Sequence, residues 1–387
     1  MNTNILISGA GIAGLTLAYW LQKFNFNPTL LEKRSDLKDE GFMIDFYGSG
    51  FDIAEKMGIL NQLQAKHYPI SELKFINSQG KTQATLSIEK FRRMLDFRHF
   101  NFMRGDLETV LYETIKNTVP IQFNTSMVQM HLHPNQVEVE FSDHTKREYD
   151  LVIGTDGIHS QTRNILWGSE SQFENFLGYY VACVITEDFL EDRDAFYTYM
   201  KPKKQVTICS IRGIRLGTLF AFKSEKHDVR THQQKLDLLS DVFGKMGWIV
   251  PEILAAMKRS PHLYFDAVSQ IKLTPWYKDR VALVGDACQC LTLLAGQGAS
   301  MAMAGAYILA TELFRTNGNY QVAFPAYQAQ LQPEIAKRQI QAQKLASSFV
   351  PDNYFSIWMM NLFVKFMFLP GFSSIFREQI GAKSIIK

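Results

Sequence analysis

Three segments of the sequence combine glycine with a carboxylate at spacings that suit nucleotide binding. The first, Gly9-Ala10-Gly11-Ile12-Ala13-Gly14, lies between a short apolar run and a segment with helical spacing. Gly9 permits a tight turn, Gly11 leaves room for a pyrophosphate, and Gly14 lets a helix pack closely on a strand. The phosphates would lie at the helix N-terminus, where unpaired N–H groups and the helix dipole favour negative charge. Glu32, 18 residues after Gly14, would bind ribose hydroxyls; the alternative is a glycine turn with an unrelated Glu.

The second and third segments each end an apolar strand in a carboxylate. Leu151-Val152-Ile153-Gly154 leads into Asp156-Gly157, and Val281 to Val284 leads into Gly285-Asp286. Carboxylates at the carboxyl edge of a parallel sheet lie where open α/β folds bind ligands. Gly296-Gln297-Gly298 then opens a predicted helix, whose N-terminus would favour an anionic group. For Asp156 the sequence leaves a second interpretation open, an N-cap residue of an ordinary strand–turn–helix.

The elements around these segments predict an α/β fold. An apolar strand over 4–8, a helix through 15–24 and a strand over 26–31 form a βαβ start, which predicts a parallel sheet. Residues 172–225 change to alternating β-type segments, which predict an antiparallel sheet in a second layer. Further expectations are a glycine-rich loop over 41–50, a helix over 53–60, two strands between 73 and 88, helices over 104–115, 232–246, 301–314 and 323–347, and a strand over 137–141.

The chain is long enough for two domains, and we expect one to be inserted in the other. The predicted architecture is a Rossmann-like dinucleotide-binding domain with an inserted antiparallel β-sheet domain for the substrate and C-terminal bridging helices. The expected divisions are 1–73, 98–170 and 266–318 for the cofactor domain, 74–97 and 171–265 for the substrate domain, 319–348 for a bridging helix and 352–387 for a C-terminal helical segment.

Composition excludes several classes of function. A formal net charge of +3 over 387 residues gives no electrostatic case for a nucleic-acid partner. The four cysteines have no CxxC spacing, so neither a disulfide framework nor a zinc site is expected, and His131 and His133 are assigned to a solvated strand face. Without a recognisable signal peptide, a cytoplasmic location is expected. The apolar run over 357–369 is too short to span a bilayer; we expect a docked helix, with a helix on a membrane surface as the alternative.

Together, the three segments resemble the one-component FAD-dependent monooxygenases related to para-hydroxybenzoate hydroxylase, over residues 4 to about 324. Four stretches, at 41–46, 149–160, 265–272 and 298–310, resemble more closely the tetracycline destructases of that family. The resemblance implies FAD as cofactor, NADPH and O₂ as co-substrates, and a flavin C4a-hydroperoxide that oxygenates a polycyclic enol or phenol such as a tetracycline. Because no second GxGxxG is present, NADPH would bind transiently at the flavin cleft. The enzyme is also expected to be a monomer without a metal.

The resemblance also assigns residues. Glu32 would hold the adenosine ribose, Arg104 and Asp45 would contact the cofactor, and Asp286 would hold its ribityl or phosphate part. The substrate candidates are Arg212, Phe220, Phe222 and Met301, for which ordinary core or surface positions are the alternative. The full set expected to bind FAD is Gly9, Gly11, Ile12, Ala13, Gly14, Glu32, Lys33, Asp45, Arg104, Leu107, Asp156, Gly157, Asp286, Gly296, Gln297 and Gly298.

The sequence departs from the family pattern beside the third segment. Cys288-Gln289 and Thr292-Leu293-Leu294 stand where the family usually has Ala-His and Pro-Pro, and Ala299-Ser300 replaces a common Asn. These changes leave substrate orientation open. Two other functions stay as alternatives: hydroxylation of another aromatic or quinone metabolite, and a flavin-binding sensor without turnover. A flavin halogenase is disfavoured because the chain has no Trp-x-Trp.

Overall fold

The computed structural model describes residues 3–37, 42–188, 190, 192–260, 263–292, 294, 296–366 and 384–386. Its first layer is a six-stranded sheet in the order β17–β18–β11–β1–β2–β7. β1 pairs in parallel with both β2 and β11, and β11 pairs in parallel with β18, which confirms the predicted parallel sheet. These strands are β1 (Asn4–Ser8), β2 (Asn27–Leu31), β7 (Ile121–Gln122), β11 (Leu151–Gly154), β17 (Tyr277–Lys278) and β18 (Val281–Leu283).

The second layer is a seven-stranded sheet in the order β16–β12–β15–β14–β13–β4–β5, antiparallel except where β13 pairs with β4. One face packs on helices α7 (His232–Phe243) and α8 (Val250–Met257), and the other packs toward the main core. The predicted antiparallel sheet is therefore present, although two of its strands, β13 and β16, were not foreseen. Its strands are β4 (Glu72–Ile76), β5 (Thr82–Ser87), β12 (Glu174–Glu187), β13 (Ala195–Lys201), β14 (Lys204–Ile211), β15 (Arg215–Lys223) and β16 (Leu263–Ile271).

The predicted loop over 41–50 is wrong for the residues that the structure describes. β3 (Met43–Tyr47) pairs antiparallel with β6 (His99–Met103), and α2 (Ser49–Met57) follows at once. The pairing partner lies more than 50 residues away along the chain, so a local pattern could not reveal it. Gly41 itself lies outside the described residues. A small three-stranded sheet of β8 (Met127–Leu132), β9 (Val137–Phe141) and β10 (Lys146–Tyr149) completes the strands.

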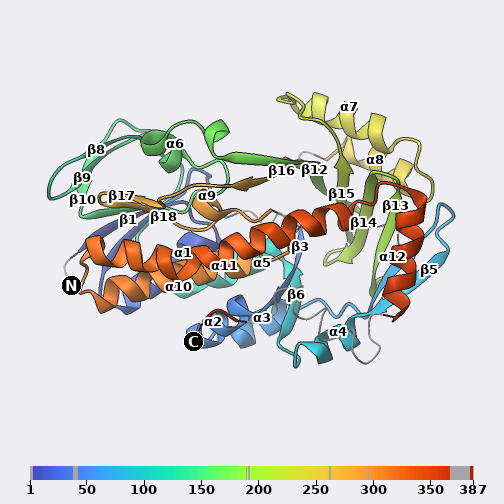
Figure 1. The fold of residues 1–387 in the computed structure, drawn as a ribbon, viewed down its shortest axis with the longest axis horizontal. Helices are drawn as coiled ribbons and strands as arrows, with labels where there is room; N and C mark the ends of the chain where they lie inside the picture. The colour runs from blue at the N-terminus through green and yellow to red at the C-terminus, as the bar shows by residue number, and fades with distance from the viewer. Residues whose placement is uncertain are drawn as a thin grey trace.

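Long C-terminal helices connect the two layers (Figure 1). α10 (Gly298–Arg315) and α11 (Tyr320–Phe349) run side by side along the six-stranded sheet, and α11 continues toward the seven-stranded sheet. α12 (Tyr354–Phe366) then packs beside β5. No helix in the described ranges combines the length and apolar character needed to cross a bilayer. The other helices are α1 (Ile12–Lys23), α3 (Leu60–Lys66), α4 (Ile88–Met94), α5 (Arg104–Ile115), α6 (Gln161–Trp167), α9 (Asp286–Gln289) and the short 3₁₀ turn Glu170–Gln172.

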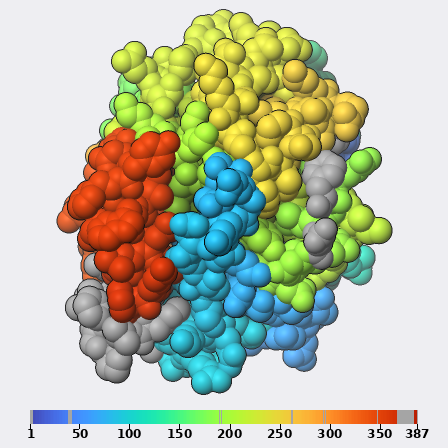
Figure 2. Space-filling model, turned by 90° about the vertical axis from the view of Figure 1, so that its right-hand side faces the viewer, coloured from blue at the N-terminus to red at the C-terminus, as the bar shows by residue number. Residues whose placement is uncertain are grey.

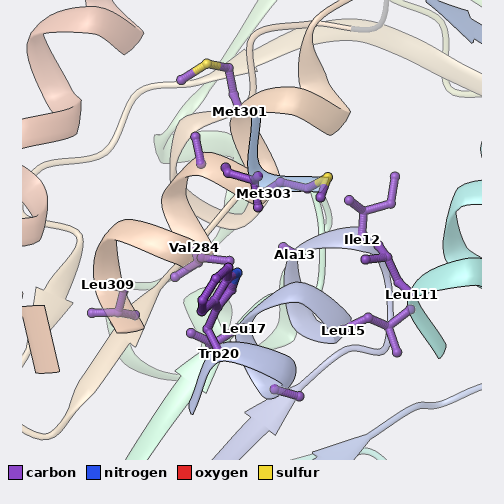
Figure 3. Close-up of a cluster of buried hydrophobic side chains, with 14 of the residues drawn as sticks. Ile12, Ala13, Leu15, Leu17, Trp20, Leu111, Val284, Met301, Met303 and Leu309 are labelled. Atoms are coloured by element: carbon purple, nitrogen blue, oxygen red, sulfur yellow. The ribbon is translucent and has the colours of Figure 1, made fainter. Parts of the chain in front are cut away.

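The main core joins the parallel sheet to α1 and α10. Trp20 of α1 packs among Leu17, Val284 and Leu309, all of them buried (Figure 3). This packing fixes the position of α1 relative to the end of β18, because closely packed interiors tolerate little displacement. The division into cofactor and substrate domains at the boundaries predicted above stays a proposal.

Candidate functional site

The three glycine-and-carboxylate segments meet at one edge of the parallel sheet. Because β1, β11 and β18 are adjacent and parallel, Gly9, Thr155 and Val284 all follow the carboxyl ends of their strands. The Thr155 hydroxyl donates a 2.8 Å hydrogen bond to the carbonyl of Gly9. Arg163, fully buried, donates a 2.8 Å hydrogen bond to the carbonyl of Ala287, beside the third segment. The segments thus form one site, as their spacing predicted.

Each glycine of the first segment meets a different steric demand. Gly9 has a φ of +107°, and a Cβ there would lie 2.9 Å from backbone atoms after β11. A Cβ at Gly14 would lie 1.9 Å from the carbonyl oxygen of Gly9, so only glycine allows α1 to start so close to β1. Gly11 is different: its Cβ would meet only the side chains of Glu108 and Arg104, at 3.6 and 3.7 Å. The face of Gly11 is therefore a narrow opening in front of the start of α1.

The start of α1 suits an anion. No side chain caps this end of the helix, and its first turn holds no acidic residue. Ile12 and Ala13, both predicted to contact the cofactor, are buried and can offer only their backbone to a ligand. Unpaired N–H groups with the positive end of the helix dipole favour phosphate at such a position.

Glu32 binds the backbone of the glycine turn between β1 and α1. One carboxylate oxygen accepts a 3.0 Å hydrogen bond from the backbone N–H of Ala10, and the other accepts from the backbone and side chain of Arg34. Burial by itself would raise the pKa of Glu32, but the hydrogen bonds and charge of Arg34 hold that pKa below its ordinary value. The carboxylate is therefore ionised and able to accept ribose hydroxyls. Lys33 beside it is exposed.

Arg104 and Glu108 of α5 face the opening at Gly11. They form a 2.9 Å ion pair across one helical turn, and Glu108 is almost fully buried. Sequence analysis missed Glu108, although its spacing four residues after Arg104 places both on one helix face. Leu107, by contrast, is fully buried in the main core, so its side chain does not face the site.

The second segment carries a structural role for Asp156. Its carboxylate accepts hydrogen bonds from the Ser160 hydroxyl and from the backbone and hydroxyl of Thr162, at 2.6 to 2.9 Å. Ser160, not Asp156, is the N-cap residue of α6. Gly157 has a φ of +78° and open space where a Cβ would lie. Asp156 thus shapes the turn, and the open face at Gly157 is the part available to a ligand.

His159 links this turn to the seven-stranded sheet. Its two ring nitrogens lie 3.2 Å from Asp266 on β16 and 2.9 Å from Glu170, which also pairs with Arg163. These hydrogen bonds to Asp266 and Glu170 raise the pKa of His159 to about 10. The imidazolium therefore ties the two layers together at neutral pH.

The third segment places Asp286 at the start of α9. Burial raises the pKa of the Asp286 carboxyl, while the charge of Arg104 opposes that shift. A Cβ at Gly285 would lie 3.2 Å from Ala13, so this corner touches α1 directly. Open space lies where a Cβ would project from Gly296 and Gly298.

Gln297, between those glycines, contacts Arg338 of α11, and Arg338 is itself buried. The bridging helix therefore supports the glycine loop that opens α10. Sequence analysis did not single out Arg338, because nothing in the local pattern of a long helix marks which residue faces a distant loop.

Comparisons with known proteins agree with this geometry. The model of a family described as FAD binding domain matches residues 2–318. The chain belongs to this family of FAD-dependent monooxygenases. A flavin-dependent monooxygenase of Legionella longbeachae is 35% identical over 367 residues, which cover 94% of this chain and 90% of the relative.

Several solved protein structures are similar to this flavoprotein over nearly the whole chain. Tetracycline destructase Tet(51) has a TM-score of 0.83 at 30% identity and covers 95% of this chain and 97% of its own. Tetracycline destructase Tet(55) has a TM-score of 0.86 at 29% identity, over 100% and 99% of the two chains. Klebsiella pneumoniae HpxO, solved with FAD and uric acid, shares the fold at 19% identity and a TM-score of 0.79, over 98% of this chain and 96% of its own.

The residues at the sheet edge fit the FAD that the family binds. The space in front of Gly11, the acceptor at Glu32 and the open space at Gly296 and Gly298 are features that a dinucleotide needs. The individual roles assigned to these residues stay proposals. Asp45 lies on β3, and its carboxylate accepts hydrogen bonds from His99 at 2.9 Å and Asn101 at 2.5 Å, which orient it.

The flavoprotein's predicted substrate residues divide into two groups. Phe220 and Phe222 are both fully buried against Phe243 of α7 on the outer face of the sheet, which favours the core positions that the sequence left open. Met301 is also buried, in the main core (Figure 3). Arg212 lines a cavity and is the candidate that stays accessible to a ligand.

Proposed function

We propose that this monooxygenase uses NADPH and O₂ to insert one oxygen atom into a polycyclic enol or phenol, with tetracyclines as the favoured substrates. The observation that carries the proposal is a cavity of about 390 Å³ between the start of α5 and the inner face of the seven-stranded sheet. That volume lies in the range of small-molecule sites. Its wall combines apolar Ile185 and Ile211 with the cations Lys66, Arg212 and Arg215 around one carboxylate, Asp106.

These residues suit a flat, oxygen-rich and partly anionic molecule. Arg212 lies 4.2 Å over the ring of Tyr68 and 3.2 Å from Asp106, and Asp106 also pairs with Lys66 at 3.4 Å. The guanidinium is thereby held in one orientation and can offer hydrogen bonds to an enolate. Bound FAD supplies the activation of oxygen, and the chain positions the substrate and excludes water. Hydroxylation of another aromatic or quinone metabolite is the second candidate, since the same cavity chemistry serves a phenolate.

The test uses purified, FAD-loaded enzyme with NADPH in air. A tetracycline should stimulate NADPH oxidation, and mass spectrometry should show a product heavier by one oxygen atom. Replacing NADPH by NADH tests the choice of co-substrate. If tetracyclines stay unchanged while a panel of phenols and quinones is oxygenated, the drug assignment fails and the second candidate holds. We further propose that the protein is a monomer and that it is cytoplasmic; the four buried free cysteines suit a reducing compartment.

A further inference from the structure

The cations in front of the start of α1 are already paired with carboxylates. Arg104 lies 2.9 Å from Glu108, and Arg34 lies 3.0 Å from Glu32. The charge of Glu108 also acts on Arg34, so the two ion pairs belong to one cluster. An incoming pyrophosphate is an anion and would have to share these guanidinium groups with carboxylates that already hold them.

Glu108 is the least compensated member of this cluster. Its side chain is 1% exposed, and in the ranges that the structure describes neither of its oxygens accepts a hydrogen bond. The ion pair with Arg104 is therefore its main compensation. A carboxylate removed from water is costly unless a cation and hydrogen bonds offset the lost hydration. Any ligand that draws Arg104 away leaves a buried charge poorly compensated.

Arg104 is placed to serve two anions. Its side chain is 37% exposed, and its Nη2 would lie 3.7 Å from a Cβ at Gly11. A guanidinium binds phosphate and carboxylate through the same N–H donors. A carboxylate that only supports an arginine would lie behind it, away from the ligand. Glu108 does not, because its Oε1 would lie 3.6 Å from the same Cβ, as close to the face of Gly11 as the guanidinium is.

We propose that Glu108 competes with FAD for Arg104 and thereby limits how tightly the enzyme holds its flavin. Binding of the pyrophosphate takes hydrogen bonds of Arg104 from Glu108 and leaves two anions side by side. Like charges a few ångströms apart in a partly buried place change a dissociation constant by about tenfold or more. Glu108 is thus a positioning residue that acts through Arg104. The inference rests on the proposed place of the pyrophosphate at Gly11 and is independent of the substrate.

The test is titration of the deflavinated, full-length protein with FAD, followed by flavin fluorescence. Glu108→Gln removes the charge at nearly constant size, and we expect its Kd for FAD to fall at least tenfold, with slower release of the flavin. Glu108→Asp keeps the charge and should show no such gain. The matched control is Glu113→Gln on the same helix, because Glu113 is exposed and pairs with Lys116 at 2.6 Å. This control should bind FAD like the parent.

Two comparisons isolate the electrostatic cause. ADP carries a pyrophosphate, so as a competitor of FAD it should gain affinity in Glu108→Gln by a similar factor, whereas adenosine should not. Glu252→Gln on α8 removes one negative charge from the outer side of the seven-stranded sheet, where Figure 2 shows the α7 and α8 segment in yellow on the surface. This variant should leave the Kd for FAD unchanged.

Urea unfolding of each apoprotein shows that it is folded, and Glu108→Leu, also uncharged, replaces Glu108→Gln if that variant is not. An unchanged Kd overturns the proposal, and a higher Kd would mean that the carboxylate supports Arg104 for FAD, which overturns it too. An equal gain for adenosine overturns it as a change in packing. Gly11→Ala separates the inference from the site: parent affinity there overturns both. A loss in Gly11→Ala without a gain in Glu108→Gln overturns the inference alone.

Discussion

Substituting Gly11 separates cofactor binding from folding. Gly11 has a φ of −80° and a ψ of −172°, a conformation that alanine adopts freely. The new methyl group would lie 3.6 Å from Glu108 and 3.7 Å from Arg104, which are ordinary contacts. The free energy of unfolding of Gly11→Ala apoprotein should therefore hold or rise by about 0.4–1 kcal/mol.

FAD binding should respond in the opposite direction. The methyl group occupies the face through which the backbone would meet the pyrophosphate, and losing one hydrogen bond to a charged group costs about 1.5–3 kcal/mol. The Kd for FAD should therefore rise about 10- to 150-fold. Titration of deflavinated protein, followed by quenching of FAD fluorescence, measures this change, and urea unfolding of the apoprotein measures its stability. Gly14→Ala is the contrasting variant, because its methyl group would lie 1.9 Å from a carbonyl oxygen and should destabilise the apoprotein itself by roughly 1–3 kcal/mol.

Two results would refute this reasoning. Wild-type FAD affinity in Gly11→Ala would place the pyrophosphate elsewhere along the sheet edge. An apoprotein destabilised as strongly as Gly14→Ala would show that the opening at Gly11 is a packing contact and not a ligand site.

Three further predictions concern single side chains. Asp286→Ala should purify colourless, whereas a fully loaded yellow variant would contradict its role. Because burial raises the pKa of Asp286, ionising this carboxyl should lower the stability of the apoprotein as pH rises from below 3.8. Urea unfolding should find no such decline in Asp286→Asn. His159, with its pKa raised to about 10, should stabilise the fold fully below pH 6.5 and lose that contribution as pH rises through 10. The melting temperatures of wild type and His159→Gln should therefore converge above pH 10. A constant difference between them would contradict the ion pairs. Phe220→Ala should lower the free energy of unfolding by about 3–5 kcal/mol at unchanged KM, because Phe220 is buried in the core. Arg212→Ala should raise the KM for substrate with little loss of stability, because Arg212 lines the cavity. Steady-state kinetics and unfolding that show the reverse pattern would make Phe220 the substrate residue.

The sequence by itself predicted that the three segments meet at one edge of a parallel sheet, because the determinants are local. The six residues from Gly9 to Gly14 contain both the turn and the start of α1, and Asp156 and Asp286 follow the ends of β11 and β18 within three residues. The apolar runs over 151–154 and 281–284 then required a parallel sheet, which brings the strand ends to one edge. Short sequence windows therefore carried enough information to predict the edge.

Only the tertiary structure decided which residues line the cavity and which lie in the core. In β15 alternate side chains point to opposite faces, and a strand pattern cannot tell which face packs on α7 and α8, since both faces carry apolar residues. That ambiguity is why Phe220 and Phe222 could be proposed as substrate residues although the fold buries them against α7. The strand pairing of β3 with β6, the contact of Arg338 with Gln297 and the docking of α12 on β5 likewise join residues far apart in the chain. Their partners are selected by packing over the whole molecule, which no local spacing encodes.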